Sequence, residues 1–455
     1  MKKSLIFFIS LFFLFHSSWV LAGALDKYEK KPVPRPVTPQ VYTKKIENGM
    51  TLFLLEDHTL PSVYVKVITR TGSIYTAPEK IGLTDIAGPL MITGGAGSLS
   101  PEQFDKQVDD LGIEISSHIN REMSETDIAF LSQDTEKGLG LLFDVLFKPK
   151  FDEKRLAVTR SKIEEKLRRE DDDPDALASR NFRQLVYGDS NIWARRPTNS
   201  TLKNVSTEDV LSFHNKYFKT NQMILAASGD FKIDEFVNLI NRLTKNVSSG
   251  DVNFPEVAPV VPEFAPAIKN ITKPLTQSFI RMGHLGVKRT NPDKYALTIM
   301  SDVLGAGSFK SRLMEDIRTK RGYAYSVWSD MSFGSDLGLF IVGVDTKAAQ
   351  TKEVVDIIAS HVKKMASGAG ITPSELTFAK QSILSRFAFE FDSLFKIVSR
   401  RAIFRYYDYP DNYWQVYYDK MLDVNASDVK RVASKYLHPD GLKIIVVGPK
   451  ALGEY

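Results

Sequence analysis

An internal repeat limits the folds open to this chain of 455 residues more than any other feature of the sequence. The tetrapeptide Gly-Ala-Gly-Ser at Gly95–Ser98 returns as Gly305–Ser308. After each copy comes a helical stretch that stops at a glycine, Gly112 in the first and Gly322 in the second, at the same separation. Glycine ends helices because it adopts the left-handed conformation at little cost. Ordered matches at a constant offset predict a duplicated domain.

The ends of the two copies match as well. Ser206 stands three positions before Asp209, and Asn425 stands three positions before Asp428, which are acidic variants of the capping box that opens a helix. Each predicted helix runs into an apolar strand that ends in glycine. The duplication therefore extends over the full length of both copies.

Within each copy, predicted strands and helices are mixed. Val63–Ile68 and Leu339–Val344 are rich in β-branched residues, whereas Phe151–Arg169 and Ser374–Phe389 are typical of long helices. Such a mixture favours a sheet covered by a layer of helices in each domain. The pattern predicts an α+β chain of two domains.

A proline-rich segment, Phe254–Pro266, separates the copies and favours an extended linker. The predicted organisation is a signal peptide at 1–22, an N-terminal extension at 23–40, a first domain at 41–250, a linker at 251–272 and a second domain at 273–455.

The N-terminus is typical of a secretory signal. Lys2 and Lys3 precede an apolar stretch, Leu5–Phe15, and Val20–Ala22 forms a small-residue cleavage site. An uncleaved membrane anchor is the alternative, although the apolar stretch is shorter than the roughly 20 residues that span a bilayer. We expect a periplasmic protein without a membrane span once the signal is removed.

Composition excludes several functions. The formal net charge is +5, from 60 basic and 55 acidic residues, and no long basic run occurs, which argues against nucleic acid as a partner. The chain has no cysteine, so it has neither disulfides, nor a thiolate metal site, nor a cysteine nucleophile.

A series of motifs follows in a specific order in the first half of the chain: Gly72-Ser73, Gly82-Leu83, Gly94-Gly95, Leu111-Gly112 and the tail Phe213–Asp230. This order resembles that of one family, the pitrilysin/insulinase-like zinc metallopeptidases, and the resemblance covers nearly all of residues 40–450. The resemblance implies two homologous domains, each a mixed, mainly antiparallel sheet covered by helices.

Active members of that family carry His-x-x-Glu-His in the helix after Gly-Leu, where two histidines bind zinc and the glutamate is the base. Here Asp85 and Pro89 stand in place of the histidines, and Gly88 stands in place of the glutamate. Proline has no side-chain donor for a metal, and glycine has no group for a proton. We therefore expect no zinc and no catalytic residue in the first domain.

Other catalytic sites find no support in the sequence. None of the seven histidines lies four positions from another, and Glu164 and Glu165, near the place of the family's distant zinc ligand, are typical of a solvated helix face. His214 is expected to be structural. No Gly-x-Ser-x-Gly elbow occurs, and Gly-Ala-Gly-Ser lacks the lysine of a phosphate loop.

The second domain retains a feature of the family's substrate site. Arg318, at the end of a predicted helix, and Tyr325, on the next strand, match an arginine and tyrosine pair that contacts substrate, with Gly322 making the turn between them. Both side chains can donate hydrogen bonds to a peptide carbonyl. The alternative is that Arg318 caps a helix end and Tyr325 fills a core.

The resemblance implies a zinc-less, non-catalytic subunit. In the heterodimeric branch of the family, one chain holds zinc and its partner supplies the arginine and tyrosine across a shared peptide chamber. We expect this chain to be the second kind, with a homologous zinc-bearing subunit and a peptide as partners. A purely structural scaffold of the same fold is the alternative, and an active hydrolase with an unconventional site is a third. The tyrosine-rich stretch Tyr406–Trp414 is expected to pack between helices, with a contact surface as the alternative.

Overall fold

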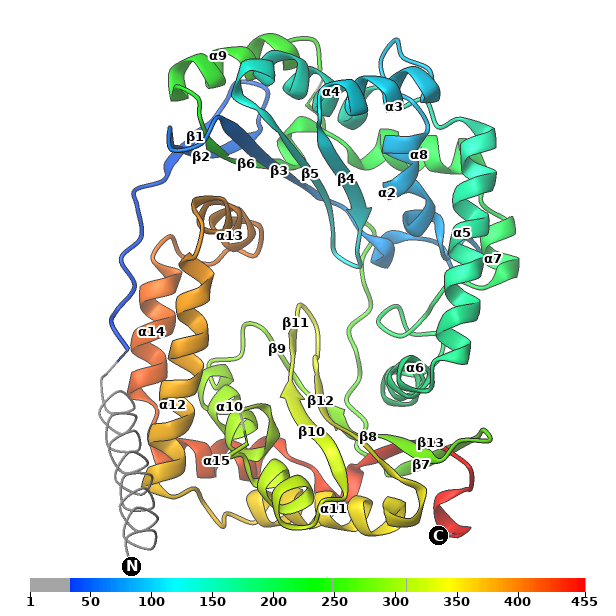
Figure 1. Ribbon diagram of the computed structural model, residues 1–455, viewed down its shortest axis with the longest axis vertical. Helices are drawn as coiled ribbons and strands as arrows, with labels where there is room; N and C mark the ends of the chain where they lie inside the picture. The colour runs from blue at the N-terminus through cyan, green and yellow to red at the C-terminus, as the bar shows by residue number, and fades with distance from the viewer. Residues whose placement is uncertain (1–32, 248, 308, 455) are drawn as a thin grey trace, which may run out of the picture. The chain divides into compact units, whose positions relative to one another are not determined.

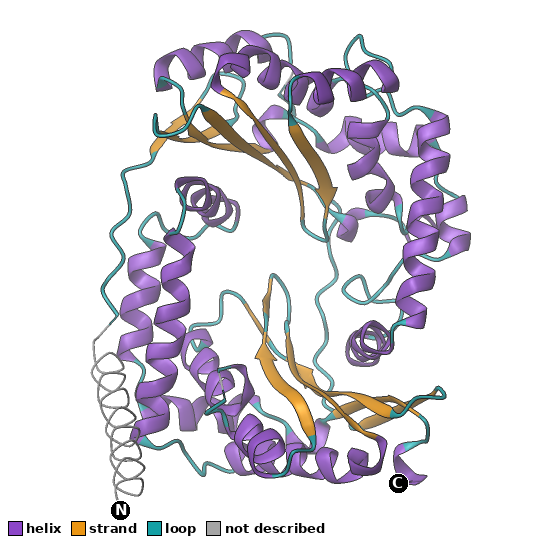
Figure 2. Ribbon diagram, in the orientation of Figure 1, coloured by secondary structure: helices purple, strands orange, loops and turns teal. Residues whose placement is uncertain are grey.

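The computed structural model describes residues 33–247, 249–307 and 309–454, coloured along the chain in Figure 1 and by secondary structure in Figure 2. The predicted signal peptide at 1–22 and residues 23–32 of the predicted extension lie outside the described residues. Val37–Tyr455 forms one unit with a continuous set of contacts. Within the described residues, no helix combines the length and apolar character needed to cross a bilayer.

Two sheets form the centre of the fold. The first has the order β1-β2-β6-β3-β5-β4, with bounds β1 Tyr42–Lys45, β2 Thr51–Glu56, β3 Ser62–Arg70, β4 Glu114–Ile119, β5 Met123–Leu131 and β6 Met223–Gly229. The second has the order β10-β12-β8-β13-β7, with bounds β7 Ala267–Thr272, β8 Gln277–Leu285, β10 Ala324–Met331, β12 Leu339–Lys347 and β13 Lys443–Gly448. A short parallel pair, β9 Val287–Lys288 and β11 Phe333–Gly334, stands apart from them.

The two sheets have the same topology over five strands. In each, one parallel pair, β2 with β6 or β7 with β13, is followed by antiparallel neighbours. The sequence of strands β2-β6-β3-β5-β4 thus matches β7-β13-β8-β12-β10. The predicted fold class, two homologous α+β domains with mainly antiparallel sheets, is confirmed.

The helices of the first copy are α2 Leu83–Thr93, α3 Pro101–Asp110, α4 Thr135–Phe147, α5 Glu153–Asp172, α6 Pro174–Tyr187, α7 Asn199–Lys203, α8 Thr207–Tyr217 and α9 Ile233–Thr244. Those of the second copy are α10 Lys294–Ser301, α11 Thr351–Ala366, α12 Pro373–Phe387, α13 Leu394–Tyr406, α14 Tyr413–Asp423 and α15 Ala426–Tyr436, with the π-helices η5 Asp302–Ala306 and η6 Met314–Lys320.

The helix caps, helix-ending glycines and apolar strands that the sequence predicts are present in the structure. Ser206 and Asp209 form a capping box at α8, and Asn425 and Asp428 form one at α15, in both cases with reciprocal side-chain and backbone bonds. The two glycines predicted to end matching helical stretches, Gly112 and Gly322, are both left-handed, with φ 59° and 64°. The strands β6 and β13 are apolar almost throughout because they are buried on both faces.

Each sheet is covered on one face by a helix from the other copy. Helix α6 of the first copy packs on β8 and β13, and α13 of the second copy packs on β2, β3 and β6 (Figure 1). The face under α13 is an apolar seam, which we define by Phe53, Ile68, Ala226, Ile397, Val398, Ala402 and Trp414. This reciprocal exchange ties both copies into one unit.

The proline-rich segment between the copies has neither helix nor strand at 249–266, but it is held in place. The backbone N–H of the buried Val260 donates to Asp336 Oδ2 at 2.6 Å, and the Phe254 ring lies 5.1 Å from the ring of Tyr75. Strand β7 occupies residues 267–272, the last part of the predicted linker. The segment therefore crosses the molecule as a bound strap.

Candidate functional site: the altered zinc-motif helix and its cavity

Helix α2 carries the three motif positions, and they face different surroundings. Asp85 and Pro89 are exposed along one side of the helix, whereas Gly88 is buried against strand β4. A Cβ atom on Gly88 would lie 2.9 Å from the Cα of His118 and 3.1 Å from the carbonyl oxygen of Ser117. Only glycine fits so close to another backbone. A glutamate at this position has no room, so the residues present do not fit a zinc peptidase site.

Asp85 is the one ionisable group left at the three motif positions. Its side chain opens on a cavity, but the surrounding walls keep water at a distance and raise its pKa. The positive charge of Lys166, on α5, opposes that rise. The Lys166 Nζ atom lies 3.9 Å from Glu170 Oε1. Lysine and glutamate of α5 therefore face Asp85 across the cavity.

Glu165, near the place of the family's distant ligand, takes no part in this arrangement. Its carboxylate pairs with Arg168 and Arg169 on the same helix, at 3.0 Å from the Nε atom of Arg169. These pairs lower its pKa. The solvated helix face predicted for this residue is confirmed.

Among residues 33–247, 249–307 and 309–454, no group of three or more histidine, aspartate or glutamate side chains is placed to hold a metal. His214 is buried, its Nε2–H donates to the carbonyl of Leu146 at 2.9 Å, and its ring stacks on Phe218. Burial lowers its pKa to about 4, so the ring is neutral near pH 7. His214 is structural, as predicted.

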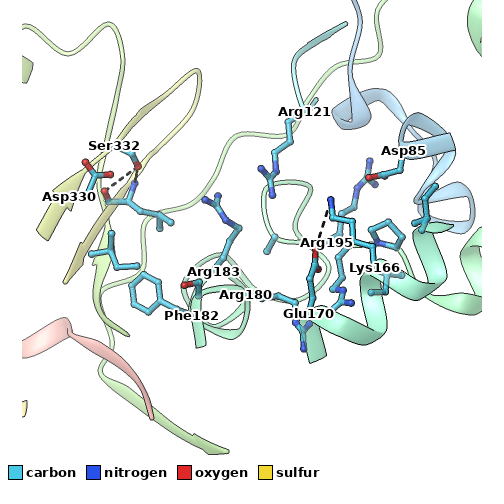
Figure 3. Close-up of a pocket in the computed structure, with 18 of the residues that line it drawn as sticks. Asp85, Arg121, Lys166, Glu170, Arg180, Phe182, Arg183, Arg195, Asp330 and Ser332 are labelled. Carbon is cyan, nitrogen blue, oxygen red and sulfur yellow. Dashed lines mark hydrogen bonds and ion pairs between the residues drawn. The ribbon is translucent and has the colours of Figure 1, made fainter. Parts of the chain in front are cut away.

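The cavity beside α2 has a volume of about 470 Å³ and a strongly basic lining (Figure 3). We call it the basic cavity. Its three acidic side chains are Asp85, Glu170 and Asp330, and its six cationic side chains are Arg121, Lys166, Arg180, Arg183, Arg195 and Arg196. They come from α2, from the turn between β4 and β5, from α5 and α6, from the loop after α6, and from β10. The excess of cations suits an anionic ligand.

Arg318 and Tyr325 lie together, outside the lining of the basic cavity. Arg318 is in η6, Tyr325 is on β10, and Gly322, with φ 64°, makes the turn between them. The Arg318 guanidinium carbon is 4.7 Å from the centre of the Tyr325 ring and 4.5 Å from that of Phe309. Tyr325 is 84% exposed, so its hydroxyl is open to a ligand.

The tyrosine-rich stretch lies where α13 meets α14 and contacts the first copy. The hydroxyl of Tyr406 donates to the carbonyl of Glu122, and the Glu122 carboxylate pairs with Arg289 at 2.8 Å. Arg289 lies 3.7 Å over the ring of Tyr407. The predicted packing role is present, and it joins the β4–β5 turn to the second copy.

Comparison with known proteins identifies the family of this chain. Residues 52–192 match the model described as Insulinase (Peptidase family M16), and residues 204–383 match the one described as Peptidase M16 inactive domain. The chain belongs to peptidase family M16. Because its first domain lacks the His-x-x-Glu-His motif, it is a member of the inactive type, as predicted.

Relatives of M16 type cover nearly the whole chain. An uncharacterized zinc protease of Rickettsia felis is 24% identical to this chain over a region that covers 86% of this chain and 93% of the relative's length. A protein of Helicobacter pylori named non-peptidase homolog YmxG is 23% identical over 87% of this chain and 91% of its own. The crystal structure of a peptidase M16 inactive domain from Pseudomonas fluorescens superimposes with a TM-score of 0.81 at 21% identity, covering 91% of this chain and 98% of that one. These likenesses show that the chain has the M16 fold, in which Asp85, Gly88 and Pro89 occupy the motif positions.

The sequence identified the motif helix but missed the basic cavity. Four of the cavity's cations, Arg121, Lys166, Arg183 and Arg195, lie on four separate segments of the chain. Nothing in the sequence around each one distinguishes it from an ordinary arginine or lysine of a protein surface. The adjacent pair Arg195-Arg196 was the only local signal. Tertiary folding alone collects these charges.

Proposed function

We propose that this M16 protein is the non-catalytic subunit of an exported, heterodimeric metallopeptidase. A homologous subunit supplies zinc, water and the general base. This chain supplies Arg318 and Tyr325, which hold a peptide in a chamber shared by the two subunits. Export to the periplasm is proposed from the signal sequence at residues 1–22.

The exposed Arg318–Tyr325 pair is the observation that carries the proposal. Within the described part of the chain, the guanidinium of Arg318 has aromatic rings as its neighbours and forms no ion pair. Stacking fixes the plane of the guanidinium while its N–H groups stay available. An exposed phenol and an unneutralised guanidinium can both donate to a carbonyl oxygen or to the oxyanion that develops on it.

A second arginine and tyrosine pair nearby provides a contrast. The Arg321 guanidinium carbon lies 5.9 Å from the ring centre of Tyr323, but its N–H groups already bond Asp316 at 2.9 Å and Glu353 at 3.1 Å. Arg321 is therefore neutralised by its own fold. Arg318 differs from it in keeping its charge for an outside partner.

The test is reconstitution with a zinc-bearing M16 homologue exported by the same organism. Cleavage of a library of unstructured peptides is measured for the mixture, and Arg318→Ala and Tyr325→Phe are compared with wild type. We expect kcat/KM to fall about 10- to 100-fold with either substitution, because each removes a hydrogen bond made to the reacting carbonyl. The matched controls Arg321→Ala and Tyr323→Phe should change it less than about threefold.

A structural scaffold is the outcome that would replace the proposal. A mixture that forms a stable complex without cutting peptides would favour it. So would a complex whose activity is the same with Arg318→Ala as with Arg321→Ala.

A further inference from the structure

We infer that the basic cavity binds a peptide carboxylate, held between the guanidinium groups of Arg121 and Arg183. The two arginines come from opposite walls, the β4–β5 turn and helix α6, and their side chains point toward one another across the cavity (Figure 3). Two facing guanidinium groups repel each other unless an anion lies between them. A carboxylate between them would accept hydrogen bonds from both.

Arg121 lacks a partner of its own. Within the described residues, its side chain forms neither a hydrogen bond nor an ion pair. Burial and the nearby positive charge of Arg183 lower the pKa of Arg121. The nearest compensating charges are Asp85 and Glu122, and Glu122 is already paired with Arg289. The charge of Arg121 is therefore left for a ligand.

The turn that carries Arg121 is rigid, so the site is built before a ligand arrives. The side-chain oxygen of Asn120 accepts the N–H of Glu122 at 2.8 Å and that of Met123 at 3.0 Å. The carbonyl of Arg121 accepts the N–H of Ile74 at 3.1 Å. A Cβ on Gly72 would meet that carbonyl at 2.1 Å, so the close approach requires glycine. Preorganisation of this kind lowers the cost of binding.

Arg195 acts as a positioning residue for the same wall. One of its terminal nitrogens donates to the carbonyl of Ser73 at 2.7 Å and to that of Thr76 at 2.6 Å. These bonds hold the segment at Ser73–Thr76, whose backbone N–H groups donate to the carbonyls of Asn120 and Arg121 in the turn. On the opposite wall, Arg183 lies 5.9 Å from the ring centre of Tyr187 on its own helix. Both walls therefore present their guanidinium groups from ordered backbone.

The rest of the lining indicates an acidic peptide segment as the source of the carboxylate. The volume of about 470 Å³ falls within the roughly 300–1,000 Å³ of ligand sites. Apolar side chains, among them Ile163, Phe182 and Ile341, alternate with the arginines. An inorganic anion gains nothing from such surfaces, whereas the methylene groups of a glutamate do. The choice of a peptide rests on the proposed function, but the site is expected to bind without the zinc-bearing partner.

The experiment measures binding by the full chain alone. Titration calorimetry compares a pentapeptide that contains two glutamates with the same peptide carrying glutamines. Both peptides are blocked at the N-terminus, and each is measured with a free and with an amidated C-terminus. We expect the glutamate peptide to bind at least tenfold more tightly, and binding to weaken as salt rises. Preference for the free C-terminus over the amide, with no effect of glutamate, would place the carboxylate at the peptide end instead.

Variants separate the cavity from general charge. Arg121→Gln and Arg183→Gln should each weaken binding of the glutamate peptide tenfold or more, while Arg183→Lys should keep part of it. The matched control Arg168→Gln, which breaks an ion pair with Glu165 on the outer side of α5, should have no effect. Thermal unfolding of each variant confirms that it is folded.

Equal binding of the glutamate and glutamine peptides, without a preference for the free C-terminus, would overturn the inference, as would unchanged binding by Arg121→Gln and Arg183→Gln. Displacement of the peptide by an equal concentration of inorganic phosphate would overturn the choice of a peptide. Arg318→Ala should leave this binding intact. Failure here and failure of the reconstituted cleavage are therefore distinguishable.

Discussion

Helices α6 and α13 occupy equivalent places in the two copies, yet they cover their sheets in different ways. Under α13 lies the apolar seam, in which Trp414 contacts the rings of Phe391 and Phe404 at 5.1 Å. Under α6, apolar side chains also pack on the second sheet. Arg281, 1% exposed, lies there as well, and its guanidinium pairs with Asp175 of α6 and with Asp345 at 3.3 Å. The α6 side also opens into the basic cavity.

This difference shows that equivalent helices of a duplicated fold can contribute differently to stability and to ligand binding. A seam of apolar side chains contributes stability in proportion to the area it removes from water. A buried ion cluster contributes little net stability, because desolvation offsets much of its attraction. Apolar clusters under both helices thus hold the two copies together, and the α6 side carries in addition charged groups that can meet a ligand.

The largest effect is expected in the apolar seam. Trp414→Ala should lower the free energy of unfolding by about 4 kcal/mol, because it removes a fully buried ring from a site with little room to collapse. Chemical denaturation measures the loss. The control Phe389→Ala, at a side chain that is 67% exposed, should change it by less than about 0.5 kcal/mol. A loss below about 1 kcal/mol for Trp414→Ala would show that the seam is not a core.

A smaller effect is expected at the motif helix. Gly88→Ala should cost about 2 kcal/mol, because its methyl group meets the backbone of β4. The control Gly140→Ala, in α4, has nothing within 4 Å of the new methyl group and should gain about 0.5–1 kcal/mol of helix stability. Equal behaviour of the two variants in denaturant would contradict the packing of α2 against β4.

The smallest effect concerns the wall of the basic cavity. Desolvation by the surrounding cavity walls raises the folded-state pKa of Asp85 above its ordinary value of 3.8, so the ionised form carries a penalty. Asp85→Asn should therefore raise the unfolding midpoint at pH 7. The gain should shrink as pH falls through the raised pKa and vanish below 3.8, where the wild-type carboxyl is protonated in both states. A gain in the unfolding midpoint that grew in acid would contradict the direction of this shift.

Much of the fold was predictable because short local sequence motifs, repeated in both halves of the chain, indicate the duplication. Glycines at helix ends and capping residues such as Ser206 act within a few positions, so their meaning survives without tertiary structure. The loss of the zinc motif was predictable for the same reason, since Pro89 and Gly88 lack the required atoms whatever their surroundings.

The rest depends on contacts between distant segments. Nothing in Leu394–Tyr406 indicates which sheet α13 covers, since any apolar helix face suits either one. The tight approach of Gly88 to β4 and the meeting of Arg121 with Arg183 likewise arise only when remote segments come together. Arg318 and Tyr325 are close in sequence, and their proximity was predictable; their role stays a prediction.

The measurement that tests the central claim most directly combines zinc titration of the purified chain with peptide cleavage, alone and with its zinc-bearing homologue. We predict no stoichiometric zinc and no cleavage by this chain alone, with cleavage appearing only in the mixture. One zinc per chain together with zinc-dependent cutting by the chain alone would contradict the account.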